Sequence, residues 1–167
     1  MKVIFLDIDG VLNSTRSCAA YDGYPWPGAS KERDWHKFDD VAVKLLRRLC
    51  QKTGAVCVLS SSWRLHMNND DIRDLAKYLG VNIVGCTREH KIDPYGSYGS
   101  EVRGYQIQDW LDSRPYVESY VIIDDSTDML YTQMYNFVRV DANDGLSFHN
   151  YLDAYKILNK EESHENI

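Results

Sequence analysis

Residues 2–12 read KVIFLDIDGVL, and this stretch decides the fold. Its first half, residues 2–6, is a continuous apolar and β-rich run, which is typical of a parallel strand covered on both faces. The run ends abruptly at Asp7-Ile8-Asp9-Gly10. Side chains two residues apart point the same way from an extended chain, so Asp7 and Asp9 are expected on one side. The stretch therefore predicts a buried strand with two carboxylates at its C-terminal end.

Four further apolar runs follow along the chain and are predicted to be strands. Between them lie segments with the apolar spacing, capping residues and glycine stops of helices. Strands that alternate with helices form βαβ units, so we expect an α/β fold with a five-stranded, mainly parallel sheet. The predicted strands are residues 55–59, 81–86, 120–123 and 137–140, and the predicted helices begin at Asp39 or Asp40, at Asp70 or Asp71, at Gly104 and near Ser147.

The length of 167 residues suits a single domain, and no repeat or linker divides the chain. We expect this domain to span residues 1–160, followed by a polar tail at 161–167. Two segments rich in Gly, Tyr and polar residues interrupt the pattern of strands and helices. They are predicted to be an irregular, cap-like loop at about 13–37 and a short surface insertion at about 87–102.

The composition narrows the class of function. An apolar fraction of 44% is enough for a real core and argues against a disordered chain. The formal charge of −6 disfavours stable binding to long nucleic acid, which requires a basic surface that releases counterions. A small phosphorylated ligand, or one nucleic-acid end in a local basic pocket, remains compatible with this charge.

The cysteines and histidines point to no zinc or disulfide chemistry. The four cysteines form no CxxC pair, and the five histidines form no HExxH motif, so we expect free thiols and no histidine-based metal site. The apolar run at the N-terminus is too short for a signal peptide or a membrane span. We therefore expect a soluble, cytoplasmic protein with no membrane partner.

A second acidic pair, Asp124-Asp125, follows the predicted strand at residues 120–123. Ligands of open parallel sheets bind beyond the carboxyl ends of the strands, where this pair would meet Asp7 and Asp9. Carboxylates gathered there repel one another and raise one another's pKa. A bound Mg²⁺, which prefers oxygen ligands, would relieve this repulsion. Either pair alone could be a strand-end turn or a helix cap. Two pairs, each directly after a buried strand, favour a metal site.

Residues 5–12, FLDIDGVL, resemble the first signature of the haloacid dehalogenase (HAD) superfamily of phosphatases. The resemblance implies a three-layer Rossmann-like HAD fold and an aspartyl-phosphate mechanism. In this mechanism Asp7 is the nucleophile, and Asp9 is the general acid that protonates the leaving oxygen and then activates water. Gly10, which permits a sharp turn after the strand, is expected beside the substrate.

The second HAD signature is a strand that ends in Ser or Thr, and residues 55–59 followed by Ser60 match it. By resemblance, the Ser60 hydroxyl donates to the phosphoryl oxygens, with Ser61 as a substitute; a plain Ser-rich turn is the alternative. Arg64, a few residues further, is a candidate clamp for a second phosphate or carboxylate. A surface or core-anchoring role for Arg64 is equally open.

The third signature is normally a Lys at the start of the helix before the last catalytic strand, and here the chain departs from the family. Arg103 holds the fitting position and keeps the charge needed to screen the aspartyl-phosphate. Lys91, in the insertion, is the competing candidate, and a plain surface charge is a third interpretation.

The fourth signature matches residues 121–128, VIIDDSTD. The resemblance implies that Asp124 binds Mg²⁺ together with Asp7 and the main-chain carbonyl of Asp9. Asp125 would share the metal or orient its water. Asp128 is interpreted as the first-turn residue of a following helix, where it would favour the helix dipole.

The order of these motifs resembles the HAD domains of RNA-repair proteins and the phosphatase half of polynucleotide kinase–phosphatases. With only a minimal cap, we predict an open site and removal of a terminal phosphate from a nucleotide or an RNA or DNA end. Alternatives are a phosphatase of another small metabolite, a phosphoryl transferase, or a non-catalytic phosphate-binding module. Aromatic residues of the segment at about 18–38, together with basic residues in or just before it, could stack a base and hold a phosphate, or simply pack onto the domain: Arg16, Tyr21, Tyr24, Trp26, Lys31, Arg33 and Trp35.

Overall fold

The computed structural model describes residues 1–21, 23, 32–88 and 102–160 of the chain. Within these ranges the strands β1 to β5 form one sheet in the order β3-β2-β1-β4-β5, and each of their pairings is parallel. The predicted α/β class and five-stranded sheet are therefore confirmed. The strands are β1 (Lys2–Leu6), β2 (Val56–Leu59), β3 (Ile83–Cys86), β4 (Ser119–Asp124) and β5 (Phe137–Arg139).

The register of the three central strands places their ends in one row. Leu6, the last residue of β1, pairs with Leu59 of β2 and with Ile123 of β4. The next residue of each strand is therefore a neighbour of the others across the sheet edge: Asp7, Ser60 and Asp124. The sheet itself thus brings these three predicted site residues together.

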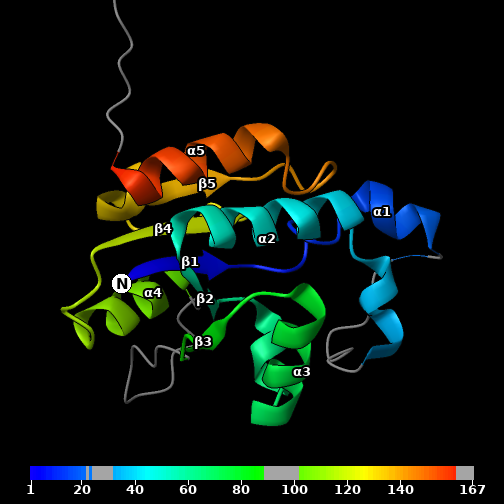
Figure 1. The fold of residues 1–167 in the computed structure, drawn as a ribbon, viewed down its shortest axis with the longest axis horizontal. Coiled ribbons are helices and arrows are strands. Elements are labelled where there is room, and N and C mark those ends of the chain that lie inside the picture. Colours follow the sequence, from blue (N-terminus) through cyan, green and yellow to red (C-terminus); the bar gives the residue numbers. More distant parts are fainter. Residues whose placement is uncertain (22, 24–31, 89–101, 161–167) are drawn as a thin grey trace, which may run out of the picture.

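Helices cover both faces of the sheet (Figure 1). Side chains of β1 alternate between two cores, because successive residues of a strand point to opposite faces. Ile4 and Leu6 lie in the larger core beneath α2, α3 and α5, whereas Val3 and Phe5 pack beneath α4. The helices are α1 (Thr15–Ala20), α2 (Asp40–Thr53), α3 (Asn69–Leu79), α4 (Arg103–Asp112) and α5 (Phe148–Asn159), with shorter 3₁₀ helices η1 (Glu32–Lys37), η2 (Ser62–His66) and η3 (Tyr131–Asn136).

Local capping explains where these helices begin. Asp39 caps α2 and accepts a hydrogen bond from the Val41 N–H at 2.8 Å. Of the two predicted caps, Asp39 and Asp40, the first is therefore the correct one. The predicted start of α3 was wrong by one or two residues, because Asn68 caps it instead of Asp70 or Asp71. The loop predicted at about 13–37 contains α1, whose Ser14 and Ser17 form a reciprocal capping box.

None of the helices in the described ranges combines the length and the apolar character that crossing a bilayer requires. Some of the residues and segments named above lie outside the described residues: Tyr24, Trp26 and Lys31, most of the predicted insertion with Lys91, and the predicted tail.

Candidate active site

Asp7 lies at the centre of the site, directly after β1. Its backbone N–H donates to the carbonyl of Ile123 at 3.1 Å, which ties the first residue beyond β1 to the end of β4. The residue is buried, at 4% exposed. After it, Gly10 turns the chain with a φ of 73°, and the Ile8 carbonyl accepts hydrogen bonds from three following N–H groups. The turn holds Asp7 and Asp9 on a short, fixed segment.

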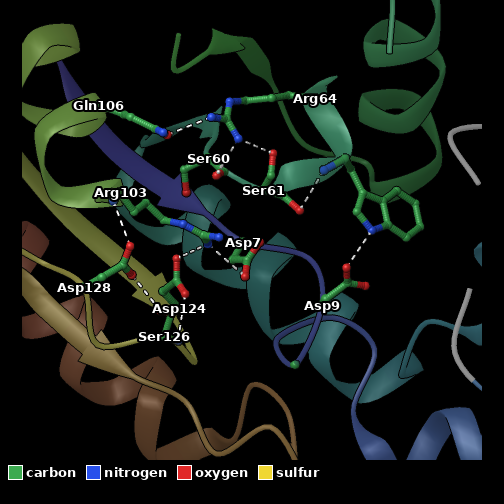
Figure 2. Close-up of polar contacts among 12 residues, drawn as sticks. Asp7, Asp9, Ser60, Ser61, Arg64, Arg103, Gln106, Asp124, Ser126 and Asp128 are labelled. Atoms are coloured by element: carbon green, nitrogen blue, oxygen red, sulfur yellow. Dashed lines mark hydrogen bonds and ion pairs between the residues drawn. The ribbon is translucent and has the colours of Figure 1, made fainter. Parts of the chain in front are cut away.

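Arg103 connects the two acidic pairs (Figure 2). Its Nη1 atom lies 2.9 Å from an Asp7 Oδ2 atom and also forms an ion pair with Asp124 Oδ2. Burial alone would lower the pKa of Arg103, but the charges of Asp7 and Asp124 raise it above its ordinary value. The arginine is therefore a permanent cation between the predicted nucleophile and a predicted metal ligand. This is the placement expected for the third-signature residue.

The first turn of α4 holds Arg103 in place through residues that follow β4. The Arg103 backbone N–H donates to Asp128 Oδ2 at 2.8 Å, and the Gly104 N–H donates to the Asp128 carbonyl at 3.1 Å. A Cβ atom at Gly104 would lie 2.5 Å from the Leu130 backbone nitrogen, so only glycine fits there. Gln133, fully buried, donates to the Gly104 carbonyl at 2.8 Å.

Asp128 itself differs from the prediction. Residues 126–130 are not helical, so Asp128 is not a first-turn residue of a following helix. Instead its carboxylate caps α4, a helix that precedes it by a whole strand. Burial would raise the pKa of Asp128, but hydrogen bonds from the Arg103 N–H and the Ser126 hydroxyl lower it. Asp128 therefore does interact favourably with a helix N-terminus, but the helix is α4 and not one that follows Asp128.

Asp9 is held apart from the other carboxylates by two donors. The indole N–H of Trp63 donates to Asp9 Oδ2 at 2.9 Å, and the Asn13 amide donates to Oδ1 at 2.8 Å (Figure 2). Burial is the main cause that raises the pKa of Asp9, although both hydrogen bonds oppose it. A carboxyl with a raised pKa, fixed in orientation, suits the exchange of a proton with a substrate.

Three carboxyl groups lie close enough to hold one cation. Oxygen atoms of Asp7, Asp124 and Asp125 all lie within 4.8 Å of one another. Burial, followed by the charge of Asp7, raises the pKa of Asp124 to about 7 and also raises that of Asp125. An all-oxygen set in which two of the carboxyl groups have raised pKa values fits Mg²⁺. The Asp9 carboxylate is not in this set, so its predicted metal contact through the main-chain carbonyl stays a prediction.

Gly10 lies against this cluster. A Cβ atom at Gly10 would come within 2.6 Å of Asp125 Oδ2, so any side chain would displace a candidate metal ligand. Its own N–H donates to the carbonyl and side chain of Asn13. The structure thus supports a positioning role for Gly10, and its predicted contact with substrate stays a prediction.

Ser60 is fully buried at the end of β2, and its hydroxyl has no hydrogen-bond partner among the described residues. A buried hydroxyl without a partner costs free energy, so it indicates a site for an absent polar group. Ser60 follows Leu59, which pairs with the residue before Asp7. Ser61 has a different role: its hydroxyl accepts the Trp63 N–H at 3.3 Å and caps η2.

Arg64 is an anchor inside the protein. Its guanidinium donates to the carbonyls of Ser60, Ser61 and Thr87 and to the side chain of Gln106, at distances from 2.7 to 3.3 Å (Figure 2). Of the two predicted roles, this geometry favours the core-anchoring one over the substrate clamp. Arg64 therefore positions the Ser60 backbone.

The aromatic segment at about 18–38 is only partly described. Trp35 is buried and packs against Tyr78, with ring centroids 5.1 Å apart, as expected for packing onto the domain. Tyr21 is half exposed and meets His36 edge to face. Neither ring contacts the carboxylates, so the base-stacking interpretation stays a prediction.

The sequence did not indicate the residues that hold the candidate catalytic groups: Asn13, Trp63, Gly104, Asp128 in its capping role, and Gln133. The one local signal was Arg103-Gly104, where glycine is a poor helix residue unless a close contact requires it.

A family model described as the HAD domain in Swiss Army Knife RNA repair proteins matches residues 3–150. The matched range contains the whole site, from Asp7 to Gln133. No curated protein and no solved structure matches the chain.

Proposed function

The chain belongs to the HAD domains of Swiss Army Knife RNA repair proteins, and from this premise we propose that it is a Mg²⁺-dependent phosphatase that removes a terminal phosphate from a nucleotide or nucleic-acid end. Family membership supports a HAD-type, phosphatase-like function. The observation that carries the proposal is Arg103, whose Nη1 contacts Asp7 and Asp124 together beside the separately held Asp9. That arrangement supplies a nucleophile, a cation and an acid in one place.

In the first step a carboxylate oxygen of Asp7 attacks phosphorus and forms an aspartyl-phosphate. The bond from phosphorus to the ester oxygen breaks, and Asp9 gives its proton to that oxygen, so the substrate leaves as an alcohol. Arg103 and the free hydroxyl of Ser60 stabilise the charge that develops on the phosphoryl oxygens.

In the second step Asp9, now ionised, takes a proton from water as the water oxygen attacks phosphorus. Inorganic phosphate leaves, and the Asp7 carboxylate is restored. Trp63 and Asn13 keep the Asp9 carboxylate in one orientation through both proton transfers. Mg²⁺, held by Asp7, Asp124 and Asp125, would neutralise negative charge on the transferring phosphoryl group.

Three features support a nucleotide or nucleic-acid end as substrate. The description of the matched family refers to RNA repair proteins. The proposed cap is minimal, which leaves the site open to a bulky leaving group. The net charge of −6 opposes binding along a long nucleic acid but not the approach of one end.

The test is phosphate release from a panel of substrates, measured with Mg²⁺ and with a chelator. The panel holds mononucleotides, oligonucleotides phosphorylated at the 5′ or the 3′ end, and sugar phosphates. We expect Mg²⁺-dependent release from one of the nucleotide classes, abolished in Asp7→Asn but not in Asp70→Asn, a control on the exposed surface of α3. Release from sugar phosphates alone would contradict the substrate class. Binding without turnover would favour a non-catalytic module, and transfer of phosphate to an added alcohol would favour a transferase.

A further inference from the structure

A hollow of about 520 Å³ adjoins the acidic cluster at the β5 side of the sheet. It is lined by Asp125, a candidate metal ligand, and by residues 139–142. Figure 1 shows β5 beside β4, at the edge of the sheet. One side of this hollow is therefore the metal cluster, and its other side carries a single cation, Arg139.

The backbone of Arg139 is fixed at a defined place. Its Cα pairs with that of Asp124 in the parallel register of β4 and β5. The Asn150 amide donates to its carbonyl at 3.2 Å, and the next N–H, of Val140, donates to the Asp124 carbonyl at 2.9 Å. Adjacent strands lie about 4.8 Å apart, so the backbone of Arg139 is one strand away from Asp124, a residue of the acidic cluster.

The side chain of Arg139 lies on the same face of the sheet as Arg103. Val138 and Val140 point into the core beneath α2 and α5, whereas Phe137 packs against the core beneath α4. By the alternation of the strand, Arg139 shares the α4 face with Phe137. Arg103 begins α4, so the two arginines stand on the same side of Asp124.

Arg139 is exposed, and its guanidinium forms no hydrogen bond or ion pair with any residue that the structure describes. The other charged groups of the hollow are Asp125 and Asp141. Asp141 accepts the Asn143 N–H at 2.8 Å, and Asp125 faces the metal cluster and Gly10. Neither carboxylate lies within 4 Å of the guanidinium, so no residue in the described ranges uses any of its five donors, and they can meet an external anion.

We propose that Arg139 binds a second phosphate of the substrate: the internucleotide phosphate next to the terminal one. The inference rests on the proposed function and adds a determinant of specificity to it. The hollow adjoins the site through Asp125, which belongs to the acidic cluster with Asp7 and Asp124 and lies close to Gly10 in the turn after Asp7. Arginine suits this role, since its planar donors match a phosphate in pairs.

The test compares terminally phosphorylated dinucleotides, which carry one internucleotide phosphate, with mononucleotides. Two further substrates separate charge from base contacts: the same dinucleotide with an uncharged methylphosphonate linkage, and a nucleoside 3′,5′-bisphosphate, whose second phosphate is not a linkage. For the wild type we expect kcat/KM for the charged dinucleotide to exceed that for the methylphosphonate by about tenfold, the usual worth of a charged hydrogen bond.

The variants are Arg139→Ala, Arg139→Lys and, as a matched control, Arg48→Ala on the exposed face of α2. We expect Arg139→Ala to remove most of the tenfold difference, Arg139→Lys to keep part of it, and Arg48→Ala to keep all of it. The same ratios are measured as binding affinities in Asp7→Asn protein, so the result does not depend on turnover.

Equal activity and affinity for the charged and uncharged dinucleotides in the wild type would overturn the inference. So would a preference that survives in Arg139→Ala, or one that falls equally with Arg48→Ala. A preference for the bisphosphate over the dinucleotide would show that Arg139 binds a free second phosphate and not an internucleotide one, which would overturn the inference. Absence of turnover on every substrate counts against the proposed function, whereas the binding ratio still decides the role of Arg139.

Discussion

At the scale of single residues, Arg103 lies between two carboxylates that would otherwise repel each other. A lysine, the usual residue of this family position, ends in one compact ammonium, whereas arginine brings a broad, permanently charged plane. Here one atom of that plane, Nη1, serves Asp7 and Asp124 together. The remaining guanidinium nitrogens are therefore left for a phosphoryl oxygen.

Replacement of Arg103 by alanine should lower kcat by about 10²–10³-fold, because a charge that stabilises the transition state is lost. Arg103→Lys should recover at least a tenfold part of this loss, since the ammonium can still approach Asp7. Steady-state phosphate release measures both, with Arg73→Ala as a surface control that loses only an exposed ion pair. Equal losses in the alanine and lysine variants would show that the charge itself is not what matters.

The residues around Asp7 show what a sequence can and cannot reveal. Asp7, Asp124 and Arg103 were predictable neighbours, because parallel strands end at one edge and signatures occur in order. The partners of Asp9 were not predictable. Trp63 lies 54 positions away, and nothing in the local pattern of a tryptophan indicates that its indole N–H will meet a carboxylate. Contacts of this kind depend on tertiary packing alone.

At the scale of elements, the start of α4 is set by a residue beyond the next strand. Its N-cap position, Val102, has no side chain that can cap. Asp128 replaces that function and fixes the turn that carries Arg103. A loop after β4 thereby couples the strand that ends in the candidate metal ligand Asp124 to the helix that begins with Arg103.

Asp128→Ala should lower the free energy of unfolding by about 1–2 kcal/mol through loss of the cap, and Asp128→Asn should cost less because it keeps an acceptor. Since hydrogen bonds lower the pKa of folded Asp128, its contribution is present above the unfolded pKa of about 3.9 and is lost as the pH falls further. Urea unfolding at pH 7 and at pH 3 measures this.

The control for this prediction is Asp40→Ala, which removes an exposed first-turn acid of α2 but no tertiary cap. It should cost a few tenths of a kcal/mol. A loss for Asp128→Ala as small as that for Asp40→Ala, or one that grows at acidic pH, would contradict the capping role.

The elements themselves were predictable to different degrees. The bounds of β1 agree with the prediction at both ends, because a continuous apolar run followed by Asp-x-Asp-Gly leaves little freedom. The six residues of α1 were missed, since their stability comes from a Ser14–Ser17 capping box and from contacts with the loop after β5, where the Thr15 N–H meets the Ala142 carbonyl. Neither feature produces an apolar period.

At the scale of the whole molecule, the fold gathers negative charge at one edge of its sheet and buries it. Asp124 is fully buried and has a pKa of about 7, well above its ordinary value. Between about pH 4 and pH 7 the folded chain therefore holds more protons at this group than the unfolded chain does. The metal-free protein should lose stability as the pH rises through this window, by up to about 4 kcal/mol.

Mg²⁺ should reverse this loss, because it binds the ionised carboxylates of the folded protein only. Thermal unfolding with Mg²⁺ and with a chelator should therefore show a larger increase in Tm at pH 8 than at pH 5. The increase should shrink in Asp125→Asn, which lacks one of the three candidate ligands. An increase that is equal at both pH values, or unchanged in Asp125→Asn, would argue against metal binding at this cluster.

The central claim is that Asp7 attacks phosphorus, and one measurement tests it directly. Protein quenched during turnover is treated with borohydride, which reduces an acyl phosphate to an alcohol, and the modified residue is located by tandem mass spectrometry. Our account predicts homoserine in place of aspartate at position 7, in the presence of Mg²⁺ and substrate only. Turnover without any modification at position 7, or modification of Asp9 or Asp124 instead, would contradict it.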